Sequence, residues 1–138
     1  MKKGQMVPMV LQEHRAKRAG LHFDLRLRYP HRQKLASWAL TKARLPKKPG
    51  DKVLAVRTTD HDMSWLKFQG DIPEGSGGHG KVKIAQKGTA ELLSWQEGNL
   101  IIFKISGPTM SGKYTLIKFK EDKKQELWLL LKNKDDEE

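Results

Sequence analysis

The amino-acid sequence predicts an all-β protein, mainly an antiparallel β-barrel with short helical or irregular connections. Short segments rich in β-branched, leucine and aromatic residues recur along the chain, separated by turns that contain Gly, Pro, Asn and Asp. The chain has neither a convincing amphipathic helix nor an internal repeat. Because many short strands leave unpaired edges unless their sheet closes on itself, these observations favour a closed or nearly closed barrel.

The predicted strands follow one another along the whole chain. They cover residues 6–12, 21–27, 35–41 and 53–59 in the first half, and residues 81–86, 90–95, 100–105, 114–120 and 126–132 in the second. Three connections are predicted to be irregular: a basic loop at 15–20, a Pro- and Gly-containing stretch at 45–51, and a glycine-rich lid or wall at 70–80. We expect a single domain over residues 1–138, with flexible tails at 1–5 and 133–138.

Composition narrows the class of protein further. Hydrophobic residues make up 37% of the chain, which suffices for one core, and the absence of cysteine excludes disulfides, thiolate catalysis and cysteine-bound zinc. No apolar run approaches the roughly 20 residues of a membrane-spanning helix, and the basic start is not followed by the apolar segment of a signal peptide. We therefore expect a cytoplasmic protein with no membrane contact.

The positive charge is concentrated in one half of the chain. Residues 1–60 contain fifteen Lys and Arg against four Asp and Glu, whereas the other 78 residues contain twelve of each sign, so the first half carries the net charge of +11. A solvated surface without a specific partner would spread this charge. The asymmetry therefore indicates a polyanionic partner, either nucleic acid or a phosphorylated ligand.

The segment 21–27 alternates strictly between apolar and polar residues. One face of this strand is predicted to join the core, and it carries Leu21, Phe23, Leu25 and Leu27. The other face carries His22, Asp24 and Arg26, a combination that folding does not require. An imidazole and a carboxylate two residues apart can chelate one cation, and the next guanidinium can hold an anion beside it.

Two further histidines follow predicted strands and lie next to a carboxylate. His14 comes directly after Glu13, and His61 lies between Asp60 and Asp62, so both are candidate site residues. Trp65, in the loop after His61, is the aromatic residue that we expect near the site. The other three tryptophans are expected in the core, and His31 and His79 are interpreted as incidental loop residues.

The order of several motifs resembles a known family. These motifs are QEHRAKRAGLHFDLRL, SWALTK, LAV, DH, F-x-G-x-IPEG, SGKYTLIK and ELWLLLK. Together they span nearly the whole chain, and they resemble the 3′-phosphoesterase domain of bacterial DNA ligase D and its stand-alone archaeal relatives. The resemblance implies a β-barrel with a divalent-metal site that heals 3′ ends at DNA breaks.

The resemblance also implies a role for each matched residue. The implied metal ligands are His14, His22 and Asp24, and the preferred ion is manganese, although cobalt or zinc also suits three such ligands. The implied catalytic groups are His61, Arg26, Lys42 and His22. The implied contacts to the substrate come from Arg26, Lys42, His61, Trp65 and Arg15.

The implied substrates are DNA ends, expected at primer-template junctions. The enzyme would remove a terminal 3′-phosphate or a terminal 3′-ribonucleoside and leave a 3′-hydroxyl for a polymerase or ligase that is a separate protein. We expect a monomer. Because only thirteen residues precede His14, where the bacterial domains have a longer segment linked to ribonucleoside removal, we expect that second activity to be the weaker one.

Other departures concern single positions. Trp65 stands where the family has a tyrosine, and Val53 stands where an arginine is expected. The longer spacing from His14 to His22 resembles the archaeal branch. Two alternatives from the residues alone stay open. One is a non-catalytic nucleic-acid-binding barrel, and the other is a non-haem iron oxygenase in which His22 and Asp24 form a facial triad with a distal histidine, His61 or His79.

Overall fold

The computed structural model describes residues 1–74 and 79–135, and nearly all of them belong to β-strands or to their connections. One short 3₁₀ helix, η1, follows β4. The elements, in chain order, are β1 (Gln5–Ala16), β2 (Gly20–Arg28), β3 (Leu35–Leu40), β4 (Lys52–His61), η1 (Met63–Leu66), β5 (Gly70–Ile72), β6 (Gly80–Gln96), β7 (Leu100–Ile105), β8 (Gly112–Glu121) and β9 (Glu126–Lys132).

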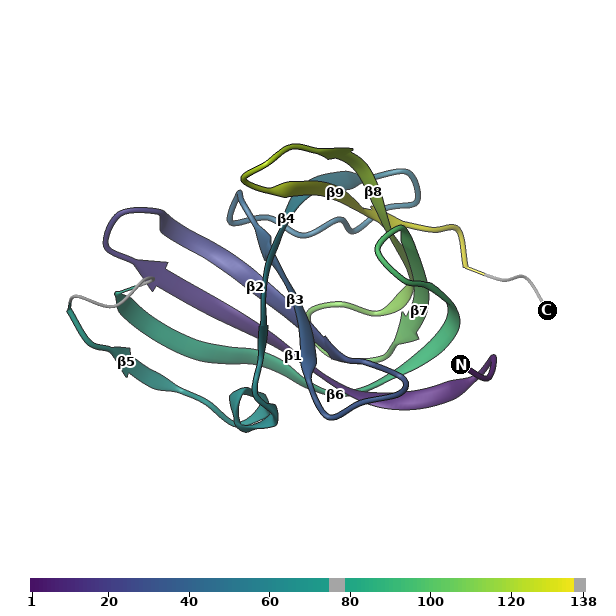
Figure 1. Cartoon of the computed structure of the whole chain (residues 1–138), viewed down its shortest axis with the longest axis horizontal. Coiled ribbons are helices and arrows are strands. Elements are labelled where there is room, and N and C mark those ends of the chain that lie inside the picture. The colour runs from purple at the N-terminus through teal and green to yellow at the C-terminus, as the bar shows by residue number, and fades with distance from the viewer. Residues whose placement is uncertain (75–78, 136–138) are drawn as a thin grey trace.

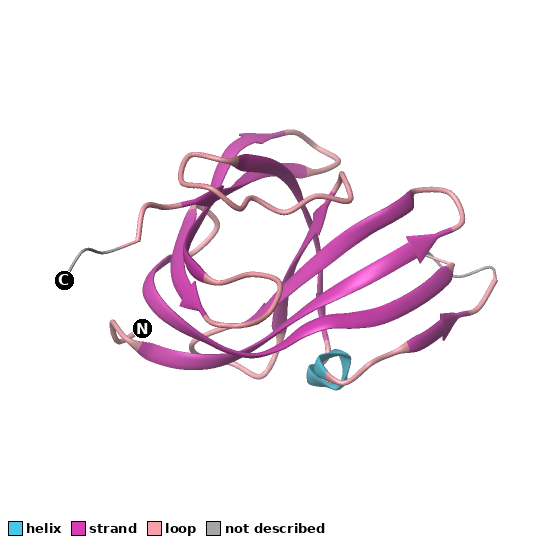
Figure 2. Cartoon of the chain, turned by 180° about the vertical axis from the view of Figure 1, so that it is seen from behind, coloured by secondary structure: helices cyan, strands magenta, loops and turns pink. Residues whose placement is uncertain are grey.

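The strands form one antiparallel sheet that closes on itself (Figures 1 and 2). Its order is β1-β2-β3-β4-β9-β8-β7-β6, and β6 pairs again with β1 to complete an eight-stranded barrel. The short β5 lies outside this ring, on the first residues of β6. The predicted all-β antiparallel barrel is therefore confirmed. None of the helices in the described residues is long and apolar enough to span a membrane.

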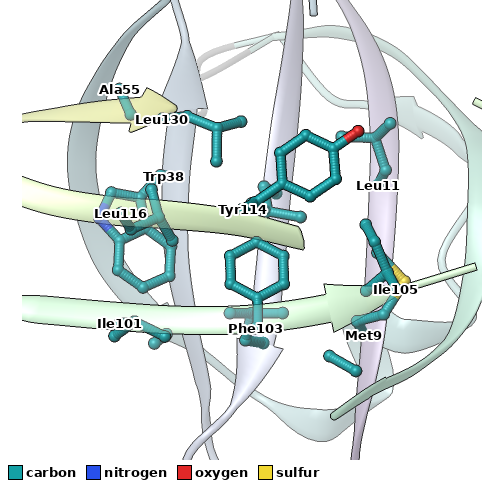
Figure 3. Packing of buried hydrophobic residues seen from close by; sticks show 14 of the residues in the cluster. Met9, Leu11, Trp38, Ala55, Ile101, Phe103, Ile105, Tyr114, Leu116 and Leu130 are labelled. Atoms are coloured by element: carbon teal, nitrogen blue, oxygen red, sulfur yellow. The ribbon is translucent and has the colours of Figure 1, made fainter. Parts of the chain in front are cut away.

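The core fills the inside of the barrel with alternate side chains from the surrounding strands (Figure 3). Leu11 on β1 and Leu25 on β2 are fully buried there, as strand alternation requires. Trp38 and Trp128 meet edge to face with ring centroids 5.5 Å apart, which confirms that both belong to the core. Val53 also points into this core, so the position where the family expects an arginine faces away from the outer surface.

Two predicted strands, 81–86 and 90–95, are in fact one long strand, so the predicted break between them is wrong. β6 runs unbroken from Gly80 to Gln96 because β1 pairs with it from Gly80 as far as Leu92. Gly88 lies opposite Met9 within this ladder. Register shifts in the pairing of β6 with β1 and with β7 mark irregularities of the kind that bend strands, which suits a strand that follows the curve of the barrel.

Several predicted boundaries also need correction. β1 continues to Ala16, so the predicted basic loop is only a tight turn before Gly20, whose φ of 75° suits a residue without a side chain. β1 begins at Gln5, a residue assigned to the N-terminal tail. The hairpin of β1 and β2 extends past the barrel, which leaves the predicted core residue Leu21 37% exposed.

The irregular stretch predicted at 45–51 contains no strand. The glycine-rich stretch predicted at 70–80 contains β5 at its start, and residues 75–78 of it lie outside the described residues. Residues 136–138 of the predicted C-terminal tail lie outside them as well.

Candidate active site and metal centre

The site is built on the outer face of β1 and β2. Strand alternation turns Leu11 and Leu25 inward, so Gln12 and Asp24 point outward, and the register places these two opposite each other. His14 lies opposite His22 in the same ladder. Cross-strand pairing thus brings together residues that are twelve and eight positions apart in the sequence.

Two imidazoles share one carboxylate at this point. The Nδ1 atom of His14 lies 3.2 Å from Oδ2 of Asp24, and Nε2 of His22 lies 3.4 Å from Oδ1 of the same group. One potential ligand atom from each of the three residues lies within 4.8 Å of the others. Two imidazole nitrogens and a carboxylate oxygen form a donor set that suits Mn²⁺, Co²⁺ and Zn²⁺, so the predicted ligand residues fit a divalent ion.

Asp24 is ionised in this environment. Burial alone would raise the pKa of its carboxyl group, but hydrogen bonds from His14 and His22 and the positive charge of Arg26 outweigh burial. The pKa of Asp24 therefore lies well below its usual range. A permanently charged carboxylate is what a cation-binding group requires.

Arg26 is held in place from two sides. Its Nε donates to Oε1 of Gln12 over 2.8 Å, and its Nη2 lies 3.7 Å from Oδ2 of Asp24. The guanidinium also lies over the indole ring of Trp65, 4.9 Å from the ring centroid. Only 3% of Arg26 is exposed, so this cation is fixed beside the cluster of His14, His22 and Asp24.

The segment from η1 to β5 lies outside the ring of eight strands (Figure 2). It covers the site, since its residues Trp65 and Phe68 line the same cavity as Asp24. Gln12 attaches it, since its side-chain Nε2 donates to the main-chain oxygens of Trp65 and Phe68. A cavity of about 550 Å³ lies between this segment and the sheet. Its lining residues are His14, His22, Asp24, Arg26, Ala39, Thr58, His61, Trp65, Phe68, Asp71, Ile72 and Pro73.

His61 enters the cavity from the end of β4. Its Nδ1 lies 2.7 Å from the main-chain oxygen of Thr59 and 3.1 Å from Nη1 of Arg26. One nitrogen cannot donate to the first and accept from the second at once, so we assign the proton to Nδ1 because the carbonyl is nearer. Burial and the charge of Arg26 lower the pKa of His61, which keeps the imidazole neutral near pH 7.

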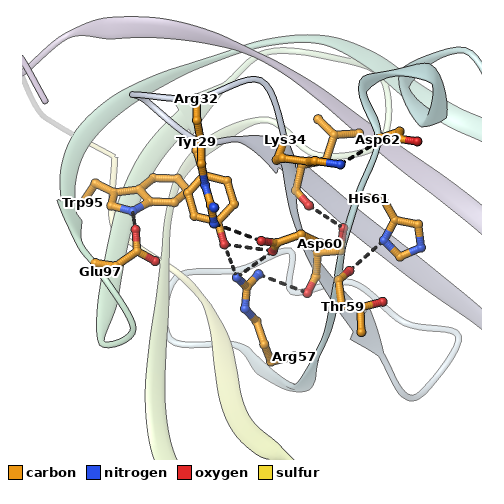
Figure 4. Close-up of polar contacts among 12 residues, drawn as sticks. Tyr29, Arg32, Lys34, Arg57, Thr59, Asp60, His61, Asp62, Trp95 and Glu97 are labelled. Atoms are coloured by element: carbon orange, nitrogen blue, oxygen red, sulfur yellow. Dashed lines mark hydrogen bonds and ion pairs between the residues drawn. The ribbon is translucent and has the colours of Figure 1, made fainter.

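A second polar network fixes the chain just before His61 (Figure 4). The hydroxyl of Tyr29 donates to Oδ1 of Asp60 over 2.8 Å, and Arg57 donates to that hydroxyl over 2.6 Å. Arg32 reaches the other oxygen of Asp60 at 3.0 Å. Asp60 therefore ties the end of β4 to the β2–β3 connection, and this positions His61.

The structure brings six of the eight predicted site residues to this cavity: His14, His22, Asp24, Arg26, His61 and Trp65. Lys42 is exposed just beyond β3 and does not line the cavity. Arg15 points to the other side of β1, where it pairs with Glu13 at 3.2 Å and lines a separate groove. Their predicted roles at the phosphate remain predictions.

Sequence reasoning missed Gln12 as a site residue. Gln12 is fully buried, and its amide group links Arg26 to the covering segment. A signal for it existed, because Gln12 precedes His14 by two residues and so shares its strand face. Thr58 was missed as well, and its place in the lining follows from the same alternation on β4.

Comparison with known proteins agrees with this geometry. The family described as the DNA Ligase D 3'-phosphoesterase domain matches residues 12–118. A multifunctional non-homologous end joining protein LigD of Mycobacterium bovis is 36% identical over 133 residues, which cover 93% of this chain and 16% of the relative. Its namesake in Pseudomonas aeruginosa is 36% identical over 132 residues, which cover 92% of this chain and 15% of the relative.

The chain therefore spans about one sixth of the length of these relatives. The family match includes every residue that lines the cavity. The resemblance seen in the sequence motifs is thus confirmed: this chain belongs to the DNA Ligase D 3'-phosphoesterase domain family.

Proposed function

We propose that this protein is a metal-dependent DNA 3′-end phosphoesterase. It would remove a terminal 3′-phosphate, and more slowly a terminal 3′-ribonucleoside, to leave a 3′-hydroxyl. The observation that carries the proposal is a buried carboxylate shared by His14 and His22, with the fixed cation of Arg26 beside it in an accessible cavity. Membership of the 3'-phosphoesterase domain family supports the same reaction class.

His14, His22 and Asp24 would hold the ion, and we propose Mn²⁺, with Co²⁺ or Zn²⁺ as substitutes. When bound, such an ion supplies Lewis-acid polarisation of a phosphoryl oxygen. The three donors come from two strands of a rigid sheet, so the site needs little rearrangement to bind a cation. The low pKa of Asp24 means that no proton has to leave the carboxylate first.

Arg26 and His61 would act on the substrate phosphate. The guanidinium of Arg26 neutralises charge on nonbridging oxygens, and its contacts with Gln12 and Trp65 keep it aimed at the cavity. His61 donates through Nδ1 to Thr59, which leaves Nε2 for the substrate. An incoming phosphate raises the pKa of this imidazole, so Nε2 takes up a proton that it can give to the leaving oxygen.

DNA is the substrate that the charge distribution favours. The excess positive charge lies in residues 1–60, which include β1, β2 and β3. A 3′-hydroxyl is the end group that polymerases and ligases extend or seal. The relatives' name, multifunctional non-homologous end joining protein, supports a role in the repair of broken ends. We further propose that this protein acts as a monomer, together with a ligase and a polymerase.

The other two classes are less well supported. A non-haem iron oxygenase uses the same two-histidine, one-carboxylate donor set. It has no need, however, for a buried guanidinium beside the ligands or for the basic half of the chain. A non-catalytic nucleic-acid-binding barrel requires neither a carboxylate shared by two histidines nor the cavity beside it.

The test is a primer assay with controlled metal content. The full chain, treated with a chelator and then dialysed, receives a DNA primer that ends in a 3′-phosphate, with or without added Mn²⁺. We expect phosphate release only with the ion, and wild-type rates from the control variant Asp62→Asn, whose carboxylate is exposed outside the cavity. Phosphate release without any divalent ion, or none with it, would contradict the proposal.

A second primer, ending in a single ribonucleotide, measures the other reaction. We expect its initial rate to be lower than that of the 3′-phosphate primer under the same conditions. The reason is that removal of the ribonucleoside also requires groups that hold the ribose and position its 2′-hydroxyl, in addition to the groups that act on the phosphate. Equal rates would show that the ribose needs no such additional groups.

A further inference from the structure

The outer face of the barrel opposite the metal centre is unusually apolar. In the ring of eight strands, β9 and β8 lie across from β1 and β2 (Figure 1). Their inward residues belong to the core, yet their outward residues are also mostly leucine and isoleucine. With those of the adjoining β4 and β7 they form what we call the apolar outer face, defined by Leu54, Leu100, Ile102, Ile117, Leu127, Leu129 and Leu131.

The register makes this face continuous. Leu54 of β4 lies opposite Leu129 of β9, which lies opposite Ile117 of β8. Ile117 in turn lies opposite Leu100 of β7. One unbroken row of apolar side chains therefore crosses four neighbouring strands.

β9 has the sequence of a strand that is buried on both faces. β9 reads ELWLLLK, with no polar residue between Leu127 and Leu131. Such continuous apolar runs are typical of strands covered on both sides, whereas a strand with one solvated face alternates. In this structure, however, Leu54 is 36% exposed and Ile117 is 38% exposed. The apolar outer face thus has the composition of a buried surface, although no other segment of the described structure buries it.

Charge identifies the kind of partner that would cover it. Lysines outnumber acidic residues over these strands: residues 100–132 contain seven Lys against three Asp and Glu, and Lys52 begins β4. One of these lysines, Lys118, is paired with Glu121. A second copy of this chain would bring the same lysines against them, and like charges across an interface disfavour it. A partner with acidic side chains around an apolar centre complements both features.

The shape of the face suits a helix. Four strands spaced about 4.8 Å apart span roughly 15 Å, which is wider than the diameter of one helix, about 10 Å. Helices commonly cover the apolar faces of sheets in this way. We propose that the apolar outer face binds an amphipathic helix of another protein segment, with Asp and Glu flanking its apolar stripe. Docking centred on β8 and β9 leaves the metal centre open to DNA, because these strands lie across the ring from β1 and β2.

The test uses a designed helical peptide of about 18 residues, or five turns, with a leucine stripe flanked by glutamates, and a counterpart with lysines in place of the glutamates. Each is titrated into the full-length ¹⁵N-labelled protein. We expect saturable amide shifts in β4, β7, β8 and β9 with the acidic peptide and binding at least about tenfold weaker with the basic one. Ile117→Glu should weaken acidic-peptide binding similarly, while phosphatase activity stays unchanged.

Two further variants test whether the loss of binding in Ile117→Glu is specific to the apolar outer face and is not caused by misfolding. Leu54→Glu changes a second exposed position of the same face, and Met6→Glu changes an exposed apolar residue outside it. The first should weaken binding and the second should not. Shifts confined to the metal-centre cavity, equal affinity for both peptides, or no saturable shift would overturn the proposal.

Two alternative occupants of the apolar outer face, a second copy of this chain and an anionic membrane, are tested separately. Sedimentation over a range of protein concentrations detects self-association through this face. Co-sedimentation with phosphatidylserine vesicles detects membrane binding. A dimer, or vesicle binding, that Ile117→Glu abolishes would overturn the helix proposal in favour of that occupant; a monomer that ignores vesicles but binds the acidic peptide would support it.

Discussion

The barrel has two contrasting outer faces. At the candidate metal centre, which we call the polar face, the outward side chains of β1 and β2 are polar or charged and largely buried: Gln12 is 0% exposed and Arg26 3% exposed. On the apolar outer face the outward side chains are apolar and partly exposed, as Ile117 illustrates at 38%. Residue type and burial are thus reversed relative to the usual pattern, in which apolar residues are inside and polar ones outside.

The two faces are stabilised in different ways. A buried guanidinium and a buried carboxylate are tolerated because every member of the group has a partner, as Arg26 has in Gln12 and Asp24 has in His14. The segment through η1 supplies the cover, and Gln12 anchors it. The apolar outer face needs no internal partners, but it gains stability only when another surface removes it from water.

Among substitutions that distinguish the two faces, Asp24→Asn should have the largest effect on phosphatase activity. The variant keeps the size of the side chain but removes the charge that a divalent ion requires, so we expect metal-dependent phosphatase activity to be abolished. Steady-state assays with the 3′-phosphate primer, together with calorimetric titration of Mn²⁺, measure this loss. Ile117→Thr, on the opposite face, serves as the matched control and should retain wild-type activity.

If Asp24→Asn keeps activity within a few-fold of wild type, the polar face is not a metal centre. Loss of activity in Ile117→Thr would instead show that the two faces are coupled. The circular dichroism spectra of both variants should match that of the wild type, because neither residue lies in the barrel interior.

Arg26→Lys tests whether the polar face depends on geometry or only on charge. Lysine keeps the positive charge but cannot contact Gln12, His61 and the ring of Trp65 at once, as the planar guanidinium does. We expect kcat to fall about 100-fold, as when one fixed transition-state donor is lost. Metal affinity should change far less, and an unchanged kcat would show that any cation suffices.

Tyr29→Phe probes the network that fixes the end of β4. The variant removes a hydroxyl that donates to Asp60 and accepts from Arg57, so we expect the free energy of unfolding to fall by about 1–3 kcal/mol. Urea denaturation measures this value. Tyr114→Phe is the matched control, since its hydroxyl contacts only uncharged main-chain groups of Ser111 in the described structure. A larger loss in the control would contradict the importance of the charged network.

The smallest expected effect is the pH dependence that His61 adds to stability. Its pKa is lower in the folded than in the unfolded protein, mainly because of burial, so unfolding takes up a proton. The contribution is fully present above the unfolded value, about 6.5, and is lost as pH falls through the folded pKa. Compared with wild type, His61→Gln should therefore lose stability less steeply between neutral and mildly acidic pH in thermal melts.

Much of the polar face could be predicted from the sequence because its signal is local. Strict alternation from residue 21 to 27 determines that His22, Asp24 and Arg26 share a face, whatever the strand pairs with. Alternation also indicated the all-β class, and the concentration of charge in residues 1–60 marked the half of the chain that contains the strands of the candidate metal centre.

Only the tertiary structure decided which distant residues join that face. The register between β1 and β2 places His14 opposite His22 and turns Arg15 away from the cavity, and a shift of one residue would have reversed both. Pairing with β1 likewise made residues 80–96 one strand despite the turn-like residue Gly88. These outcomes depend on hydrogen bonds between segments far apart in the chain, and local residue patterns carry no information about such pairing.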